Sequence, residues 1–261
     1  VADDELTFTN LLSKKELGYD YKMSAFGSSL VGNPTVKEWF EQAEAFEAWV
    51  VGKTADEVAN MALQTMGNGY VIAGEQDLLD AGCTISIEDF RDAVVNACSD
   101  EQGVTFELEA ETTFALGLGV NSSDNGSSAE DEENYVAKLN VDFAATVTVD
   151  GVIVAALNDA CQPVITVADG EVVSANVGKG DDIGLMTKRE LKENYAMAGS
   201  PWSPDNDGDG RVLEWYLQSA AFSAHVVGMT AAEVTAMTTV ESNGHQISSD
   251  ADLIAEGCTI Q

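Results

Sequence analysis

The chain has 261 residues, of which 45% are hydrophobic, and its 45 acidic and 12 basic residues give a formal charge of −33. This composition is typical of a folded protein with a sizeable core and excludes a disordered chain. A surface this acidic repels nucleic acid and anionic membranes, so nucleic-acid binding is excluded. No apolar run approaches the roughly 20 residues of a membrane span. The chain shows no signal peptide and starts at Val1 without a Met, so we expect a processed or trimmed product.

The first hundred residues predict helices. Thr35-x-x-Glu38 and Thr54-x-x-Glu57 are capping boxes, in which a hydroxyl and a carboxylate satisfy free amides of a first helical turn. Between them, apolar side chains recur at helical spacing and form one face. They are Val36, Trp39, Phe40, Ala43, Phe46 and Val50. We interpret this face as core, and Gly52 ends the helix.

The middle of the chain predicts an antiparallel sheet of four to six strands. Residues 104–180 alternate in polarity and are rich in Val and Thr. Asp150-Gly151 and Asp169-Gly170 supply turns with positive φ. The segment Asn121–Asn134 is acidic and of low complexity, and we expect a mobile loop there.

The last third of the chain repeats the first. Ser13–Met23 (SKKELGYDYKM) recurs as Thr187–Met197 (TKRELKENYAM), and Glu38–Val58 recurs as Glu214–Val234. The phrase Gly-Cys-Thr-Ile closes both copies, and the second capping box recurs as Thr230-x-x-Glu233. The offset stays between 174 and 176 residues, which predicts a duplication covering roughly residues 12–85 and 186–260.

These patterns predict an α+β fold in which two homologous helical units flank an antiparallel sheet. The first unit, residues 1–99, is helical with little sheet. The second, residues 100–261, contains the sheet (104–180) and a helical part (186–261). Trp39 and Phe46 should occupy the same buried positions as Trp215 and Phe222. We expect the central strands to cover the first unit's apolar face. A missing N-terminal part or self-association through this incomplete unit would also cover it.

Four cysteines are widely spaced: Cys83, Cys98, Cys161 and Cys258. They form no Cys/His pattern typical of zinc. Two disulfides in an exported protein and buried free thiols are both compatible with this spacing.

In each copy, strands precede a helix that starts near Glu-Trp, and Asp-Leu-x-x-x-Gly-Cys-Thr-Ile follows. This order resembles the FMN-binding domain family. Its members include flavin-carrying subunits of respiratory sodium pumps and secreted or lipid-anchored flavoproteins of Gram-positive bacteria. The Tyr-Lys-Met phrase and the Glu38–Val58 segment look especially like repeat lipoproteins of anaerobic gut Firmicutes.

The resemblance implies a covalent flavin. In flavinylated members, a transferase attaches FMN through a phosphoester bond to the threonine of a Ser-Gly-Ala-Thr motif. At that position this chain has Gly82 and Thr84 in the first copy, and Gly257 and Thr259 in the second. The motif departs from the family, because Ala81 or Glu256 replaces the serine and a cysteine replaces the alanine. We expect an exposed turn here, since the hydroxyl must reach another enzyme's active site.

A structural role for the Gly-Cys-Thr turn is the alternative. In that interpretation Thr84 or Ser86 caps a helix that starts near Glu88.

A second candidate site is an acidic turn. Three aspartates occupy positions 1, 3 and 5 of a calcium-loop pattern, with glycine at position 6. The residues that would surround Ca²⁺ are Asp205, Asp207, Asp209, the carbonyl of Arg211, and Glu214. Position 12 is Tyr216 instead of Glu, so the loop is not an intact EF-hand. A solvated Asp/Gly turn is the alternative.

Nothing else in the sequence indicates catalysis. No nucleophile elbow, phosphate-binding loop or metalloprotease helix is present. The sequence shows no obvious Ser or Cys that could act together with His225 or His245. We therefore expect an electron-transfer or binding protein: an exported cell-surface protein that carries FMN, with a flavin transferase and redox proteins as partners. A non-enzymatic surface or adhesion module without flavin is the alternative.

Overall fold

A computed structural model describes residues 12–23, 36–99, 103–177, 184–197, 213–242 and 245–260. The fold is α+β, as predicted, and its sheets are antiparallel. The chain divides into two compact units, one formed by residues 12–103 and the other by the described residues from Val104 on. This division lies close to the expected boundary between residues 99 and 100.

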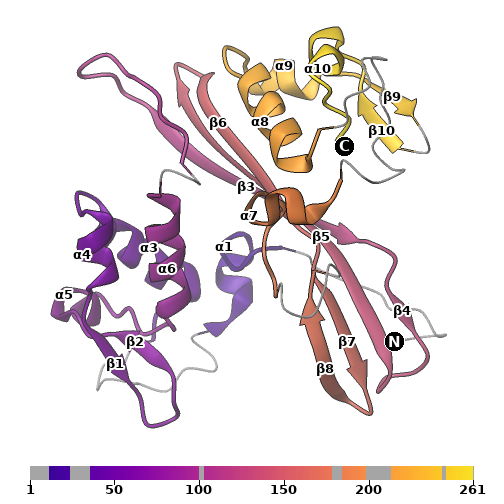
Figure 1. Ribbon diagram of the computed structural model, residues 1–261. Coiled ribbons are helices and arrows are strands. Elements are labelled where there is room, and N and C mark those ends of the chain that lie inside the picture. The colour runs from indigo at the N-terminus through magenta and orange to yellow at the C-terminus, as the bar shows by residue number, and fades with distance from the viewer. Residues whose placement is uncertain are drawn as a thin grey trace. The chain divides into compact units, whose positions relative to one another are not determined.

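The unit of residues 12–103 is mainly helical (Figure 1). Its elements in chain order are α1 (Lys14–Leu17), η1 (Gly18–Tyr21), α3 (Trp39–Val50), α4 (Ala55–Ala59), β1 (Leu63–Thr65), β2 (Val71–Ala73), α5 (Gln76–Asp80) and α6 (Glu88–Ala97). The predicted Thr54–Glu57 capping box begins α4. The helix α3 begins at Trp39 with Glu38 as its N-cap, so it starts later than a Thr35–Glu38 box predicts. Thr35 lies outside the described residues.

The sequence interpretation missed a β-hairpin between α4 and α5. Strands β1 and β2 pair antiparallel from Leu63 opposite Ala73 to Thr65 opposite Val71. Asn68-Gly69 turns the chain, with Gly69 at φ +88°. Asn-Gly is a strong hairpin signal, but strands of three residues are too short to show a period.

The first helical unit builds its own core. Phe46 is 4% exposed and lies in a cluster of buried apolar side chains that all belong to residues 12–103. The cluster consists of Ala43, Phe46, Met61, Ala73, Leu78, Cys83, Ile85 and Ile87. The ring of Trp39 packs against Phe90 of α6, with 5.6 Å between centroids. The expectation that the central strands cover this face was therefore wrong, because α5, α6 and the Gly-Cys-Thr turn supply the apolar partners.

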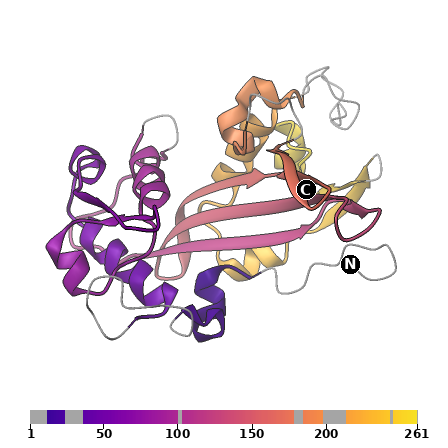
Figure 2. The same ribbon diagram turned by 90° about the horizontal axis from the view of Figure 1, so that it is seen from below.

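The second unit contains a six-stranded sheet. Its strands are β3 (Ala115–Asp124), β4 (Ser128–Ala129), β5 (Tyr135–Val149), β6 (Val152–Cys161), β7 (Val164–Ala168) and β8 (Glu171–Asn176). The long strand β5 is central, with β3 and β6 beside one end, and β4 and β7 beside the other (Figure 2). Both predicted turns are present, with positive φ at Asp150-Gly151 and at Asp169-Gly170.

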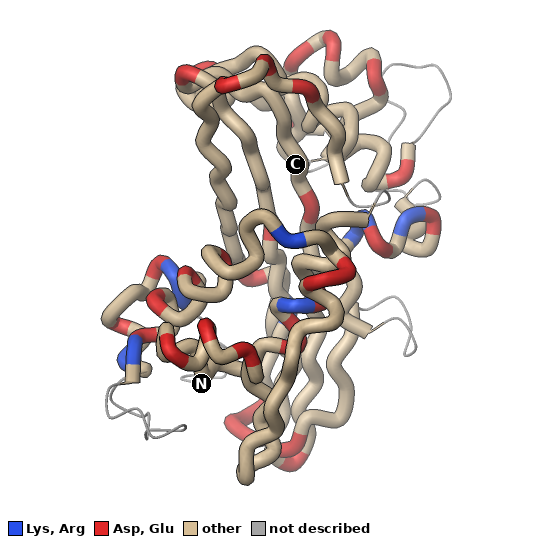
Figure 3. The backbone as a smooth tube through the Cα atoms, turned by 90° about the vertical axis from the view of Figure 1, so that its left-hand side faces the viewer, with Lys and Arg blue, Asp and Glu red and all other residues tan. Residues whose placement is uncertain are grey.

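The acidic segment 121–134 is more ordered than we expected. Strand β3 continues to Asp124, and β4 pairs with β5 inside the segment. Asp124 accepts hydrogen bonds from the amides of Gly126 and Ser127, and Asp131 accepts them from Glu133 and Asn134. These local bonds stabilise the turns without a hydrophobic core. Acidic residues gather at such turns, while the long strands carry few of them (Figure 3).

The second set of helices follows the sheet. It comprises α7 (Lys188–Leu191), η2 (Lys192–Tyr195), α8 (Trp215–His225), α9 (Ala231–Thr235), β9 (Thr239–Ser242), β10 (His245–Ser248) and α10 (Ala251–Ala255). The repeated capping box at Thr230 and Glu233 begins α9 as predicted. The pair β9–β10 is a second hairpin that we did not predict.

Helix α8 packs against strand β6 through serine hydroxyls. The Ser219 hydroxyl donates to the Asn158 carbonyl at 2.7 Å, and the Ser223 hydroxyl accepts from the Asn158 amide at 3.3 Å. These bonds satisfy the backbone of an edge strand that would otherwise be open to another chain. The equivalent residues on α3 are Ala43 and Glu47, which cannot make the same pair of bonds.

The repeated aromatic positions are similar but not equally buried. Trp215 is 7% exposed while Trp39 is half-buried, and Phe46 is buried while Phe222 is half-buried. The difference follows from the covering elements, which are β6 for α8 and α6 for α3. That the two units arose by duplication stays a prediction.

Among the described helices, none is both long enough and apolar enough to cross a membrane.

Truncation of the first core tests this packing. We expect Phe46→Ala to lower the free energy of unfolding by about 3–5 kcal/mol, because it removes a buried ring. Val51→Ala is the matched control, since Val51 is 80% exposed and its truncation should change stability by less than about 0.5 kcal/mol. Urea unfolding followed by fluorescence measures both. Equal effects of the two substitutions would contradict the assigned core.

Candidate functional site

A buried glutamine ties the parts of the first unit together. Gln42 is 0% exposed, and its Oε1 accepts from the amide of Thr84 at 2.7 Å and from the hydroxyl of Thr84 at 3.2 Å. Its Nε2 donates to the carbonyl of Lys37 at 2.8 Å and lies 3.6 Å from the sulfur of Met23. One carboxamide thus binds three segments that are far apart in the sequence.

The N-cap of α3 completes this arrangement. The Glu38 carboxylate accepts from the Met23 amide at 2.8 Å, and Glu38 is 4% exposed. We call Met23, Lys37, Glu38, Gln42 and Thr84 the first glutamine network.

The second unit contains the same arrangement. Gln218 is 0% exposed, and its Oε1 accepts from the amide and the hydroxyl of Thr259. Its Nε2 donates to the Leu213 carbonyl at 2.7 Å and lies 3.5 Å from the Met197 sulfur. The Glu214 carboxylate accepts from the Met197 amide at 2.9 Å. Met197, Leu213, Glu214, Gln218 and Thr259 form the second glutamine network.

Glycine brings each threonine to its glutamine. Gly82 and Gly257 have φ of +78° and +73°, a region that favours glycine. The next amide, that of Cys83 or Cys258, then donates back into the preceding helix at 2.9 Å. At Gly257 a Cβ atom would also lie 3.2 Å from the Leu213 side chain. The repeated Gly-Cys-Thr phrase is therefore a helix C-terminus followed by a hydrogen-bonded threonine.

A lysine lies near two aromatic rings in each unit. The Lys14 ammonium is 5.2 Å from the Tyr21 ring centroid and 5.3 Å from that of Trp39. In the second unit, Lys188 is 5.2 Å from the Tyr195 and Trp215 rings. All four distances lie within the range of a cation–π contact. This contact explains why Lys, Tyr and Glu-Trp recur together in the sequence.

The four cysteines are free thiols, but only Cys83 and Cys258 are buried as the alternative of buried free thiols expected. Cys83 and Cys258 are buried in the two turns, and Cys98 is exposed. Burial raises the pKa of the Cys83 thiol to about 11 and also raises the pKa of Cys258. A buried thiol with a raised pKa is a poor nucleophile, so these two residues act as small apolar side chains.

Both expectations about the threonines need revision. Thr84 is half-buried and Thr259 is 7% exposed, so neither lies on the freely exposed turn that we expected. The helix after Thr84 does begin at Glu88, but its N-cap is Ile87 and no side chain caps it. Thr84 and Ser86 are therefore not its caps, and Thr84 binds Gln42 instead.

The calcium prediction falls mostly outside the described residues. Asp205, Asp207, Asp209 and Arg211 are not described. Glu214 is described, and its carboxylate binds the Met197 amide as Glu38 binds Met23. The part of the chain that is described contains no group of three His, Cys, Asp or Glu side chains that could hold a metal.

A cavity lies beside the second network. It has a volume of about 360 Å³ and is bordered by the sheet, by Trp215 and by Ile260, the residue after Thr259. Gly119 and Ala144 contribute little side-chain volume to it. The remaining lining residues are Val120, Asn121, Asp142, Phe143, Asn158 and Asp159. Such a volume is in the range of small-molecule sites, and its two carboxylates would favour a cation over an anion.

The fold changes the ionisation of Asp159, which lines this cavity. Burial raises its pKa, and bonds from the Thr187 hydroxyl and from the amides of Arg189 and Ala160 partly oppose this. Because the fold itself supplies these hydrogen bonds, they fix the orientation of the Asp159 carboxylate beside α7 without a bound ligand.

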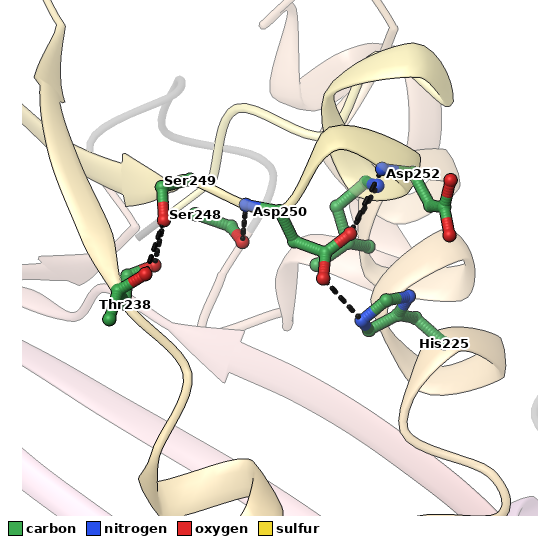
Figure 4. A network of polar contacts seen from close by, with 7 residues as sticks. His225, Thr238, Ser248, Ser249, Asp250 and Asp252 are labelled. Carbon is green, nitrogen blue, oxygen red and sulfur yellow. Dashed lines mark hydrogen bonds and ion pairs between the residues drawn. The ribbon is translucent and has the colours of Figure 1, made fainter.

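His225 has a carboxylate partner that the sequence did not reveal. Its Nε2 lies 3.5 Å from Oδ2 of Asp250 (Figure 4), too far for a good hydrogen bond. Asp250 is the N-cap of α10 and accepts from the amides of Asp252 and Leu253. The first unit has Trp49 and Glu75 at these positions, so the pair belongs to the second unit alone.

No protein-family model, curated protein or solved structure matches this chain. The resemblance to the FMN-binding domain family therefore stays a prediction, and the site rests on its geometry.

Sequence analysis missed the two glutamines at the centre of these networks. A signal was present: Gln42 and Gln218 recur within Glu-Trp-x-x-Gln, inside an otherwise apolar helix face. A polar residue repeated at a core position indicates a buried hydrogen-bonding role.

Removing the carboxamide should destabilise each unit. We expect Gln42→Leu or Gln218→Leu to lower the free energy of unfolding by about 2–5 kcal/mol, because the threonine amide and hydroxyl lose their acceptor in a buried place. Gln64→Leu is the matched control, since Gln64 is exposed. Urea denaturation measures all three. A loss below about 0.5 kcal/mol at both buried sites would contradict the role of the networks.

The buried thiol predicts an alkaline loss of stability. The pKa of Cys83 is raised from 9.0 to about 11 in the folded chain. Its contribution is therefore fully present below pH 9 and is lost as pH rises from 9 to about 11, where only the unfolded thiol is ionised. We expect Cys83→Ala to show a shallower fall in this window, measured by urea unfolding at several pH values. Cys98→Ala, at an exposed thiol, should keep the parent's slope, and an unchanged slope in Cys83→Ala would refute the assignment.

Proposed function

We propose that this chain is a non-enzymatic module of an exported cell-surface protein, in which each Gly-Cys-Thr turn fastens a helix instead of carrying a cofactor. The observation that carries the proposal is that both threonine hydroxyls are hydrogen-bonded inside the fold. Each hydroxyl donates to Oε1 of a fully buried glutamine, Gln42 or Gln218. The Nε2 of that glutamine donates to a backbone carbonyl. A hydroxyl used in this way stabilises the fold.

The rest of the chain's chemistry supports a binding module over an enzyme. The thiols of Cys83 and Cys258 are buried, and the His225 imidazole faces a carboxylate that caps a helix. The formal charge of −33 keeps such a module soluble and attracts cations to its surface. Export and surface location follow from the resemblance to secreted repeat proteins.

Flavin carriage is the second candidate. The cavity of about 360 Å³ favours it, because Ile260 borders this space and Thr259 precedes Ile260. The fit is poor in the conformation described: Thr259 is 7% exposed, and Asp142 and Asp159 would repel a flavin phosphate. Thr84 is half-buried and is the more accessible of the two. A flavin on either threonine would require the turn to open.

Substitution at Thr259 separates the two candidates. We expect Thr259→Val to lower the free energy of unfolding by about 1–3 kcal/mol, because the buried Oε1 of Gln218 loses one of its two donors, the Thr259 hydroxyl. Thr259→Ser should retain most of the stability, since it retains the hydroxyl. Thr113→Val, at an exposed position, is the matched control. These values are measured by urea denaturation of the unmodified protein.

An intact-mass spectrum after co-expression with a flavin transferase completes the test. We expect the unmodified mass, with a known flavinylated substrate as the positive control. A flavin adduct mapped to Thr84 or Thr259 would overturn the structural proposal in favour of electron transfer.

A further inference from the structure

We propose that the second unit binds a small apolar carboxylate in a cavity between strand β6, helix α8 and the segment 104–106, with Arg189 as the partner of the carboxylate group. This inference is independent of the function proposed above. It rests on the residues that line the cavity and on the sequence repeat, whose first copy contains a carboxylate at the equivalent place.

The walls of this cavity are mostly apolar. Its volume is about 290 Å³, and Val154 and Leu157 of β6 line it together with Val104, Phe106 and Val227. The last three residues are 46%, 40% and 46% exposed, so they lie where the cavity opens to solvent. Because an apolar cavity of about 150 Å³ holds benzene, this one has room for a hydrocarbon chain of several carbons.

A single cation borders this apolar space. Among the described residues that line the cavity, Arg189 is the only charged one. Its guanidinium carries N–H donors in a planar fork that matches the two oxygens of a carboxylate. An arginine beside apolar walls therefore selects a ligand with an anionic head and an apolar body.

The first copy of the repeat contains the interaction that we expect of the ligand. Lys15 stands at the position of Arg189, and its ammonium lies 2.8 Å from both oxygens of the Glu47 carboxylate. The second copy keeps the cation but has Ser223 in place of Glu47, and Ser223 lines the cavity. A ligand carboxylate beside Arg189 would thus take the place of the Glu47 carboxylate.

A second carboxylate of the first copy is also replaced beside the cavity. Glu44 corresponds to Ala220, which lines the cavity and is exposed. Packing of α8 against β6 explains the small side chain of Ser223, which is buried, but not that of exposed Ala220. Both replacements remove negative charge beside Arg189 and so lower the repulsion of an anionic ligand.

Two carboxylates close to Arg189 in the fold are engaged by the backbone of α7 and its cap. Asp159 accepts from the backbone amide of Arg189 at 3.1 Å, and burial raises the pKa of Asp159 although the charge of Arg189 acts in the opposite direction. Glu190 accepts from the Thr187 amide at 2.7 Å in the capping box. Neither of these bonds uses the Arg189 guanidinium, which stays available to a ligand.

Three probes with the same chain and different head groups test the ligand class. Isothermal titration of the intact chain would use octanoate, octylamine and 1-octanol, in salt of 0.15 M, which screens the chain's net charge beyond roughly 8 Å. We expect octanoate to bind at least about tenfold more tightly than either of the others, because only the carboxylate forms charge-assisted hydrogen bonds with arginine. Equal affinities for the three probes, or no binding of octanoate, would overturn the proposal.

Substitution of the arginine tests its role. Arg189→Met keeps an apolar side chain of similar length and removes the charge, so octanoate should bind at least about tenfold more weakly while 1-octanol is unaffected. Lys15→Met, at the equivalent position of the first unit, is the matched control and should change neither affinity. Unchanged octanoate binding in Arg189→Met would contradict the assignment.

A restored carboxylate gives an independent variant that retains the arginine. Ala220→Glu places the carboxylate of Glu44 at the equivalent position of the second unit, where it competes with the ligand for Arg189 and should weaken octanoate binding at least about tenfold. Ala232→Glu adds the same charge at an exposed position of α9 and should have no such effect. Thermal unfolding followed by circular dichroism checks that both variants are folded. Equal weakening by the two substitutions would show a general effect of charge and reject the site.

The length of the chain tests the cavity itself. Across acetate, butanoate, hexanoate and octanoate, we expect the affinity to rise by up to about fourfold for each added CH₂ group, because each group leaves water for an apolar wall. Acetate and octanoate of equal affinity would indicate a surface ion pair alone and would refute binding in the cavity.

Discussion

The buried carboxamide of a glutamine is the interaction on which each helical unit depends. Gln42 and Gln218 are fully buried and polar, so each must bond to its surroundings or destabilise the core. Their partners come from a loop before the helix and from the turn that follows the last helix of the motif. Because both the Oε1 acceptor and the Nε2 donor of the carboxamide are hydrogen-bonded, the glutamine fixes the orientation of its partner segments as well as their distance. This single requirement explains why three separate sequence motifs recur together. They are the segment that ends at Met23 or Met197, the Glu-Trp-x-x-Gln motif and the Gly-Cys-Thr turn.

The two units differ in what covers the helix that bears this glutamine. On α8, Ser219 and Ser223 bind the backbone of Asn158 and so cover a strand edge. On α3, the equivalent Ala43 lies in an apolar cluster, and Glu47 pairs with Lys15 at 2.8 Å. Serine suits a strand because a hydroxyl can bond a free backbone group, whereas alanine suits apolar neighbours. Small changes at two helix positions thus accompany a change from a sheet to a helical neighbour.

The sequence predicted elements whose signal is local. The six-stranded sheet, its Asp-Gly turns and the boxes at Thr54 and Thr230 follow from alternation and from hydrogen bonds within a few residues. The short hairpins had too few residues to show a period, and their Asn-Gly signal was not used. The cover of α3 and the partners of Gln42 depend on contacts between residues far apart in sequence, for which no local pattern exists. The threonines were identified as important positions, but their partner could not be.

The repeated lysines show how a very acidic chain uses its few cations. Lys14 and Lys188 lie in the four-residue helices α1 and α7. Both contact a tyrosine and a tryptophan ring at about 5 Å, and such contacts stabilise by about 0.5–1 kcal/mol when exposed. They also attach the first short helix of each unit to the tryptophan beside the glutamine, so the charge contributes to the fold as well as to solubility.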